Sequence, residues 1–132
     1  MYLALVSFSI YISYIDLKSH RIPNKIILFA LAIFSLLTLL LSGSFYPENA
    51  ILTLVISPFF LNFKIGAGDI KLFAILSAFF LPLSFATAAE FISVFSIIAA
   101  LLIVITVIKQ RTLYSNIALA PAICAAFIWC AR

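Results

Sequence analysis

Long runs of apolar residues, broken by short polar stretches, make up almost the whole chain. A helix that crosses a lipid bilayer needs roughly 20 mostly apolar residues, and the uncharged runs here approach that length. The pattern predicts an all-α fold, a polytopic membrane helix bundle of about six short transmembrane helices. The expected spans are residues 2–15, 26–42, 49–62, 72–89, 91–108 and 114–131.

Prolines mark positions at which these helices should bend or end, because proline lacks an amide hydrogen and clashes with the preceding turn. Pro58 predicts a kink or an early end in the third span, Pro82 lies near a turn, and Pro121 falls inside the last span. Between the first two spans, Pro23 should stop one helix and the side chain of Asn24 can cap the next.

Composition narrows the class of protein. Of the 132 residues, 67% are hydrophobic and 9% are charged, and the mean hydropathy is +1.33. Soluble domains devote about a quarter of their residues to charge, so an ordinary soluble globule is excluded. The spans leave no room for a soluble domain, and we expect one membrane-embedded domain over residues 1–132. The first run lacks the basic start of a cleavable signal, so we expect it to remain as a helix.

The distribution of charge predicts an orientation in the membrane. The net charge is +4, and seven of the eight basic residues fall in alternate loops. By the positive-inside rule those loops face the cytoplasm, which places both termini outside. Basic charge then marks topology and contact with membrane lipids, and nucleic acid is not an expected partner. The seven residues are Lys18, Arg21, Lys25, Lys64, Lys71, Lys109 and Arg111.

The sequence gives little support for metal or cofactor chemistry. Cys124 and Cys130 lie six residues apart in the last span, without a CxxC pair or a Cys/His cluster. The single histidine, His20, lies in a basic loop, and no serine is placed to pair with it. A HExxH zinc motif is also missing. We therefore expect buried thiols, no metal and no cofactor.

The chain has only two aspartates, Asp16 and Asp69, and both fall at the expected cytoplasmic edge of a span. A carboxylate near hydrocarbon costs about 2.5–3.5 kcal/mol at a helix centre and less at the edge, so such residues are candidates for function. Each aspartate taken singly could instead mark the membrane boundary, with Asp69 acting as a helix N-cap.

Two of the three glycines lie directly before the second aspartate, in Gly66-Ala67-Gly68-Asp69-Ile70-Lys71. Glycines two apart let the backbone leave helical geometry and approach another chain closely. A bare connecting loop would need no aspartate beside them. We therefore expect this loop to present the carboxylate of Asp69 to an extended peptide.

Two carboxylates on one membrane face are typical of an aspartyl dyad. Two aspartates held close together cannot both ionise, so one keeps its proton and acts as an acid while the other activates water. Such a pair hydrolyses amides without a metal. Asp16 follows a helix C-terminus and Asp69 opens a helix, so the helix dipoles favour Asp69 as the ionised base and Asp16 as the protonated acid, although coupled carboxylates titrate as a pair.

An aspartate followed six residues later by Ile22-Pro23-Asn24, together with Gly66-Ala67-Gly68-Asp69-Ile70-Lys71, resembles the signature pair of type IV prepilin peptidases, membrane aspartyl proteases of the GxGD class. The resemblance covers nearly the whole chain in motif order and spacing. It implies that Asp16 and Asp69 are catalytic. It also implies that the enzyme cuts a short leader from prepilin or pseudopilin precursors at the cytoplasmic face of the bacterial inner membrane. Ala120-Pro121-Ala122-Ile123 is similar to a proline-containing stretch of that family.

Longer prepilin peptidases carry paired CxxC motifs and a methyltransferase activity, and those cysteines are missing here. The chain is similar to the short, peptidase-only members that serve tight-adherence (Flp-type) pili, so N-methylation of the product is not expected. A non-catalytic membrane scaffold or small transporter subunit that uses the two carboxylates for a cation stays open as an alternative, as does an inactive copy of the enzyme.

The remaining polar residues of interest are two lysines and one glutamate. Lys18 and Lys71 each stand two residues after an aspartate, and residues two apart do not share a helix face. We expect both lysines to anchor the topology, with contact between Lys71 and Asp16 as an alternative. Glu90 is expected in a short outside loop, as an interface or inter-helix hydrogen-bonding group.

Overall fold

A computed structural model describes residues 1–19, 22–62, 65–82, 84–110 and 119–132 of the protein. These residues form six α-helices and no strand, which confirms the all-α prediction. The helices are α1 (Tyr2–Ser19), α2 (Asn24–Leu40), α3 (Pro47–Asn62), α4 (Ala67–Phe80), α5 (Phe85–Gln110) and α6 (Ala120–Cys130).

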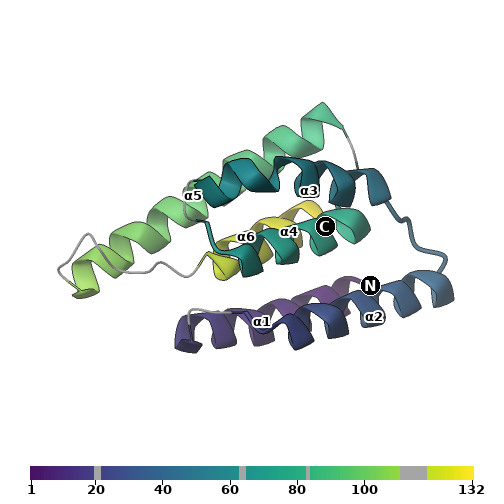
Figure 1. The fold of residues 1–132 in the computed structure, drawn as a ribbon, viewed down its shortest axis with the longest axis horizontal. Helices are drawn as coiled ribbons and strands as arrows, with labels where there is room; N and C mark the ends of the chain where they lie inside the picture. Colours follow the sequence, from purple (N-terminus) through teal and green to yellow (C-terminus); the bar gives the residue numbers. More distant parts are fainter. Residues whose placement is uncertain (20–21, 63–64, 83, 111–118) are drawn as a thin grey trace.

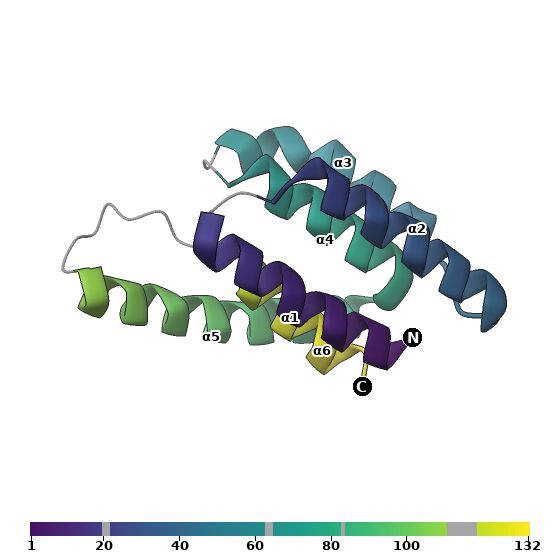
Figure 2. The same cartoon turned by 90° about the horizontal axis from the view of Figure 1, so that it is seen from below.

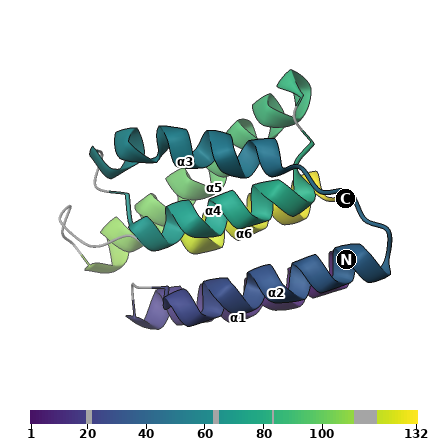
Figure 3. The ribbon, with the colours of Figure 1, turned by 45° about the vertical axis from the view of Figure 1, so that its right-hand side comes forward.

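The helices lie side by side in three layers of two, with α4 and α6 in the middle (Figures 1 and 3). On one side of this central pair α1 packs on α6 and α2 packs on α4, while on the other side α3 packs on α4 and α5 packs on α6. Figure 2 shows the same pairing from below, with α1 over α6 and α2 beside α4. The contact between α4 and α6 therefore joins the α1–α5–α6 half of the bundle to the α2–α3–α4 half.

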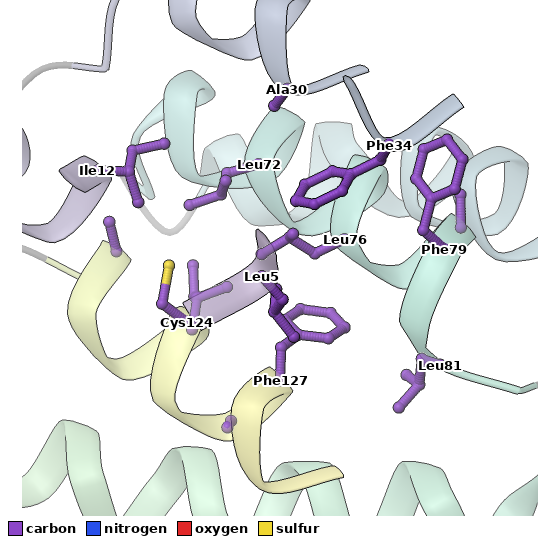
Figure 4. Packing of buried hydrophobic residues seen from close by; sticks show 14 of the residues in the cluster. Leu5, Ile12, Ala30, Phe34, Leu72, Leu76, Phe79, Leu81, Cys124 and Phe127 are labelled. Atoms are coloured by element: carbon purple, nitrogen blue, oxygen red, sulfur yellow. The ribbon is translucent and has the colours of Figure 1, made fainter. Parts of the chain in front are cut away.

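The core lies where α1, α2, α4 and α6 meet, and it consists of aliphatic and aromatic side chains (Figure 4). The ring of Phe34 on α2 is 5.1–5.9 Å from the rings of Phe8, Phe79 and Phe80, at mostly edge-to-face angles that suit aromatic pairs. The ring of Phe127 on α6 lies 4.8 Å from that of Phe91 on α5. Many of the phenylalanines therefore pack between helices.

One expected helix boundary is wrong. The fourth span was expected to run to residue 89 and the fifth to begin after Glu90, but α4 ends at Phe80 and α5 begins at Phe85. The break lies at Pro82, which cannot continue a helix, and the hydroxyl of Ser84 then accepts the amide of Thr87 as an N-cap. Glu90 lies inside α5, where its carboxylate accepts a hydrogen bond from the Trp129 indole of α6 at 3.1 Å, so its expected inter-helix role is confirmed.

Three smaller expectations about helix ends also change. Helix α3 continues past Pro58 to Asn62 instead of ending early. Pro121 lies in the first turn of α6, where its missing amide hydrogen removes no helical bond, so it does not break this helix. Asn24 does not cap α2, since Pro23 is the N-cap residue and no side-chain cap bond forms there.

The outer surface of the bundle carries many exposed large apolar side chains, among them Leu39 of α2 and Phe85 of α5. One helix, over Phe85–Ile108, is long and apolar enough to cross a membrane, and almost none of that stretch is covered by other described residues. Asn24–Leu40 and Ala120–Cys130 are apolar but shorter. The expected multi-span arrangement stays a prediction.

Candidate active site

A cavity of about 470 Å³ opens at the end of the bundle where α1 ends and α4 begins. Its wall combines both sequence motifs singled out above, although they are some fifty residues apart in the chain. From the first motif it takes Asp16, Ile22 and Asn24, and from the second Gly66, Ala67, Gly68, Asp69 and Lys71. Seven of the nine residues expected at a site therefore line one cavity.

Asp16 reaches this cavity from the last turn of α1 and is only 4% exposed. Its carboxylate oxygen Oδ2 accepts a hydrogen bond of 3.1 Å from the backbone N–H of Ala120, the first residue of α6. A buried carboxylate needs such donors, because burial without them costs several kcal/mol. The packing of α1 on α6 thus provides a partner for the acid that α1 buries.

Asp69 enters from the opposite wall, in the first turn of α4, before the uncharged run that starts at Leu72. Burial raises the pKa of Asp69 from 3.8 to about 6, and the nearby charge of Asp16 contributes in the same direction. The helix dipole alone favours the opposite, an ionised Asp69. Desolvation and the second carboxylate therefore act against the dipole that guided the sequence prediction.

The two motif glycines serve contacts within the chain. A Cβ on Gly68 would lie 3.2 Å from Cβ of Ile22, so the missing side chain lets the start of α4 pack closely on the segment before α2. A Cβ on Gly66 would lie 3.1 Å from Oδ2 of Asp69. The backbone of Gly66 also begins α4, since its carbonyl accepts the amide of Asp69 at 3.0 Å. Asp69 is therefore a first-turn residue, and the alternative that it is the N-cap is wrong.

One hydrogen bond joins the two motifs directly. The ammonium of Lys71 donates to Oδ1 of Asn24 at 3.0 Å, between α4 and the first residue of α2. Lys71 was expected only to anchor the topology, but it also has a hydrogen-bond partner, Asn24, at the cavity. Lys18 and Pro23 are exposed and do not line the cavity. His20 and Arg21, which separate the two parts of the first motif, lie outside the described residues.

Ala120 was not among the residues that the sequence motifs predicted at the site. The only signal was the similarity of Ala120-Pro121-Ala122-Ile123 to a family segment, and that gave no contact. The residue type does not reveal which backbone N–H acts as a donor, because every residue except proline has one. The contact depends on the way α6 packs against α1.

The arrangement can perform acid–base chemistry on a bound amide. Two carboxylates face one cavity, one nearly buried and hydrogen-bonded and the other with a pKa raised to about 6. A carboxyl that titrates near neutral pH can donate a proton, while its ionised neighbour can take one from water.

A family model described as the Type IV leader peptidase family matches residues 3–108, which is most of the chain and includes both aspartates. Comparison with curated proteins gave no match, and neither did comparison with solved structures. The family consists of membrane-associated peptidases that act on prepilin-type precursors. Because the matched range covers most of the chain and contains both motifs, the chain belongs to the type IV leader peptidase family.

Proposed function

We propose that this protein is an aspartic endopeptidase that removes the leader peptide from prepilin-like precursors, with Asp16 and Asp69 as its catalytic pair. The observation that supports this most is the meeting of the two aspartates at one cavity, where burial and the charge of Asp16 raise the pKa of Asp69. Residues 1–132 act as a single unit in this proposal, because the pair draws one aspartate from each half of the bundle.

The pair hydrolyses the peptide bond through an activated water. The first aspartate takes a proton from the water as the water oxygen bonds to the carbonyl carbon. The second aspartate gives its proton to the carbonyl oxygen. The tetrahedral intermediate then returns a proton from a hydroxyl to the second aspartate. The first aspartate protonates the nitrogen as the C–N bond breaks, so both carboxyls regain their starting state.

The proposed location is the bacterial inner membrane, crossed several times, with the site on the cytoplasmic side. The apolar outer surface and the long apolar helix α5 support a membrane position. The ends of α1 and α4 that carry Asp16 and Asp69 are also the ends next to Lys18, Lys25 and Lys71, as the positive-inside rule requires of a cytoplasmic face. Reaction of single cysteines placed at Asn24 and at Ser44 with an impermeant thiol reagent, in a background without native cysteines, tests this orientation.

The proposed substrates are Flp-type precursors, whose apolar segment already lies in the membrane and can approach the bundle sideways. The resemblance to short peptidase-only members supports this class, together with the expectation that the product is not N-methylated. Parallel digestion of an Flp-type precursor and a longer type IV precursor, with S-adenosylmethionine present, tests both points by the mass of the new N-terminus. Faster cleavage of the longer precursor, or a methylated product, would contradict them.

The activity itself is tested by incubating membranes that contain the protein with a prepilin and following leader loss. We expect cleavage by the wild type and none by Asp16→Asn or Asp69→Asn. Undiminished cleavage by both variants would exclude the aspartyl mechanism. Absence of cleavage in the wild type, combined with cation binding that both variants lose, would favour a transporter subunit or scaffold instead.

A further inference from the structure

The residue of α6 that contacts Asp16 is Ala120, which lies outside both sequence motifs and outside the residues matched by the family model. Ala120 begins α6, is completely buried, and directs its N–H at the Asp16 carboxylate. The following residue, Pro121, has no N–H to offer, and the amide of Ile123 bonds to the carbonyl of Leu119. The Ala120 amide is the first-turn donor whose bond to Asp16 is described.

We propose that the backbone amide of Ala120 is a positioning group that holds Asp16 as the ionised member of the aspartate pair, which leaves Asp69 to carry the shared proton. This deepens the proposed function and assigns the two roles within it. The hydrogen bond and the positive end of the α6 dipole both stabilise negative charge on Asp16. No equivalent side-chain or backbone donor is described for the carboxylate of Asp69, which is partly buried at the cavity.

The assignment reverses the roles expected from the position of each aspartate along its own helix. Asp16 lies inside α1, which continues to Ser19. Two helix dipoles therefore act on the charge of Asp16: that of the C-terminal end of α1 and that of the N-terminal end of α6. In the reaction Asp16 then takes the proton of the attacking water, and Asp69 gives its proton to the carbonyl oxygen. In the second half the two transfers run in the opposite direction, Asp69 regaining its proton and Asp16 protonating the departing nitrogen.

Other groups near Asp16 also affect its charge. From α4 the cavity brings Asp69, which opposes ionisation, and Lys71, which favours it. From α6 the neighbour is the thiol of Cys124, which lies against Ser9 and Ser13 of α1. On α1 itself the nearest charge is Lys18, which is exposed. A test must therefore change the Ala120 amide and leave these side chains in place.

Replacement of the Ala120 amide by an ester does this, since lactic acid at position 120 keeps the side chain and removes only the N–H. Lactic acid at position 122 is the matched control, because Ala122 is the same residue type, equally buried and in the same turn. Cell-free synthesis with carboxyl-¹³C aspartate labels only Asp16 and Asp69. Asp69→Asn then assigns the signals, and a pH titration by NMR in lipid nanodiscs follows each carboxyl.

We expect Asp16 to ionise at lower pH than Asp69 in the unmodified protein. The ester at 120 should move the Asp16 midpoint upward by about one pH unit or more, as expected for loss of a hydrogen bond to a charged group. The ester at 122 should move it by a small fraction of that amount. Equal shifts in the two esters, or ionisation of Asp69 before Asp16, would overturn the proposal.

A second measurement remains decisive if the ester at 120 does not fold. In the unmodified protein the ¹⁵N–H signal of Ala120 should follow the ionisation of Asp16, and Asp16→Asn should shift it far more than the signal of Ala122. An Ala120 signal that is indifferent to Asp16 would refute the contact. Neither readout needs a substrate, so a protein that failed to cleave prepilins would contradict the proposed function and leave this inference to its own result.

Discussion

The close contact between the two motifs predicts that Gly68→Ala damages the site. The new Cβ would lie 3.2 Å from Cβ of Ile22 and 3.6 Å from its backbone nitrogen. Carbon atoms pack best at about 3.5–4.0 Å, so the segment before α2 has to move by several tenths of an ångström. A rotamer change cannot relieve the clash, because Cβ is fixed to the backbone. Overpacking of this kind costs about 1–3 kcal/mol, and it pushes Asn24 away from Lys71.

Gly43, the one glycine of the chain outside the second motif, provides a matched control. A Cβ on Gly43 would lie only 2.7 Å from the sulfur of Met1, but that atom is the end of a flexible side chain and can move aside. We expect Gly43→Ala to lower the midpoint of thermal unfolding in detergent less than Gly68→Ala, and to leave prepilin cleavage unchanged. Ile22→Gly removes the atom that collides, so the double variant with Gly68→Ala should recover part of the loss as a favourable coupling energy. A Gly68→Ala protein as stable and active as the wild type, or zero coupling, would refute the reasoning.

The raised pKa of Asp69 gives two predictions. If Asp69 is the acid, kcat/KM should fall as pH rises through about 6, because that profile reports the free enzyme; a flat profile from pH 5 to 7 would contradict this. The folded protein holds the Asp69 proton more tightly than the unfolded chain does. The free energy of unfolding should therefore fall as pH rises from about 4 to about 6 and stay constant above pH 6. In thermal melts, Asp69→Asn should remove most of this pH dependence. Asp16→Asn should lower the pKa of Asp69 but leave it above 3.8, because burial is the larger cause; a ¹³C titration measures it. Lys71→Met and Asn24→Ala should each lower the free energy of unfolding by at most about 1 kcal/mol, since the hydrogen bond between the two side chains is exposed. The double variant should lose no more than either single variant. Additive losses would show that this hydrogen bond is not their shared cause.

The sequence was enough to predict the helices and most of the residues that line the cavity, because both depend on local signals. Apolar runs placed the first three helices to within a few residues at each end, and two rare residue types, aspartate and glycine, marked the cavity walls. The misplaced boundary near Glu90 shows where that logic fails. A single charge suggested a loop, but Glu90 lies inside α5 and accepts a hydrogen bond from Trp129 of another helix, and the helix break lies at Pro82.

The electrostatics of the pair could not be predicted in the same way. The position of each aspartate on its own helix suggested an ionised Asp69, but the pKa of Asp69 depends on how deeply α4 packs and on a second carboxylate brought by α1. The donor to Asp16 is a backbone amide of α6, more than a hundred residues away. The glycines were expected to admit a peptide, which stays a prediction, and their contacts within the chain were not foreseen: Gly68 admits Ile22, and Gly66 leaves room for Asp69. These features come from tertiary packing, which residue type alone does not determine.

The central claim is that two of the four carboxylate side chains of this protein perform peptide hydrolysis. The most direct test converts each acid separately to its amide, as Asp16→Asn, Asp69→Asn, Glu48→Gln and Glu90→Gln, and measures initial rates of leader removal from a purified prepilin in proteoliposomes. We predict that both aspartate variants lose cleavage while remaining folded, and that both glutamate variants cleave at close to the wild-type rate. Cleavage that survives in either aspartate variant would contradict the assignment of the pair as the catalytic centre.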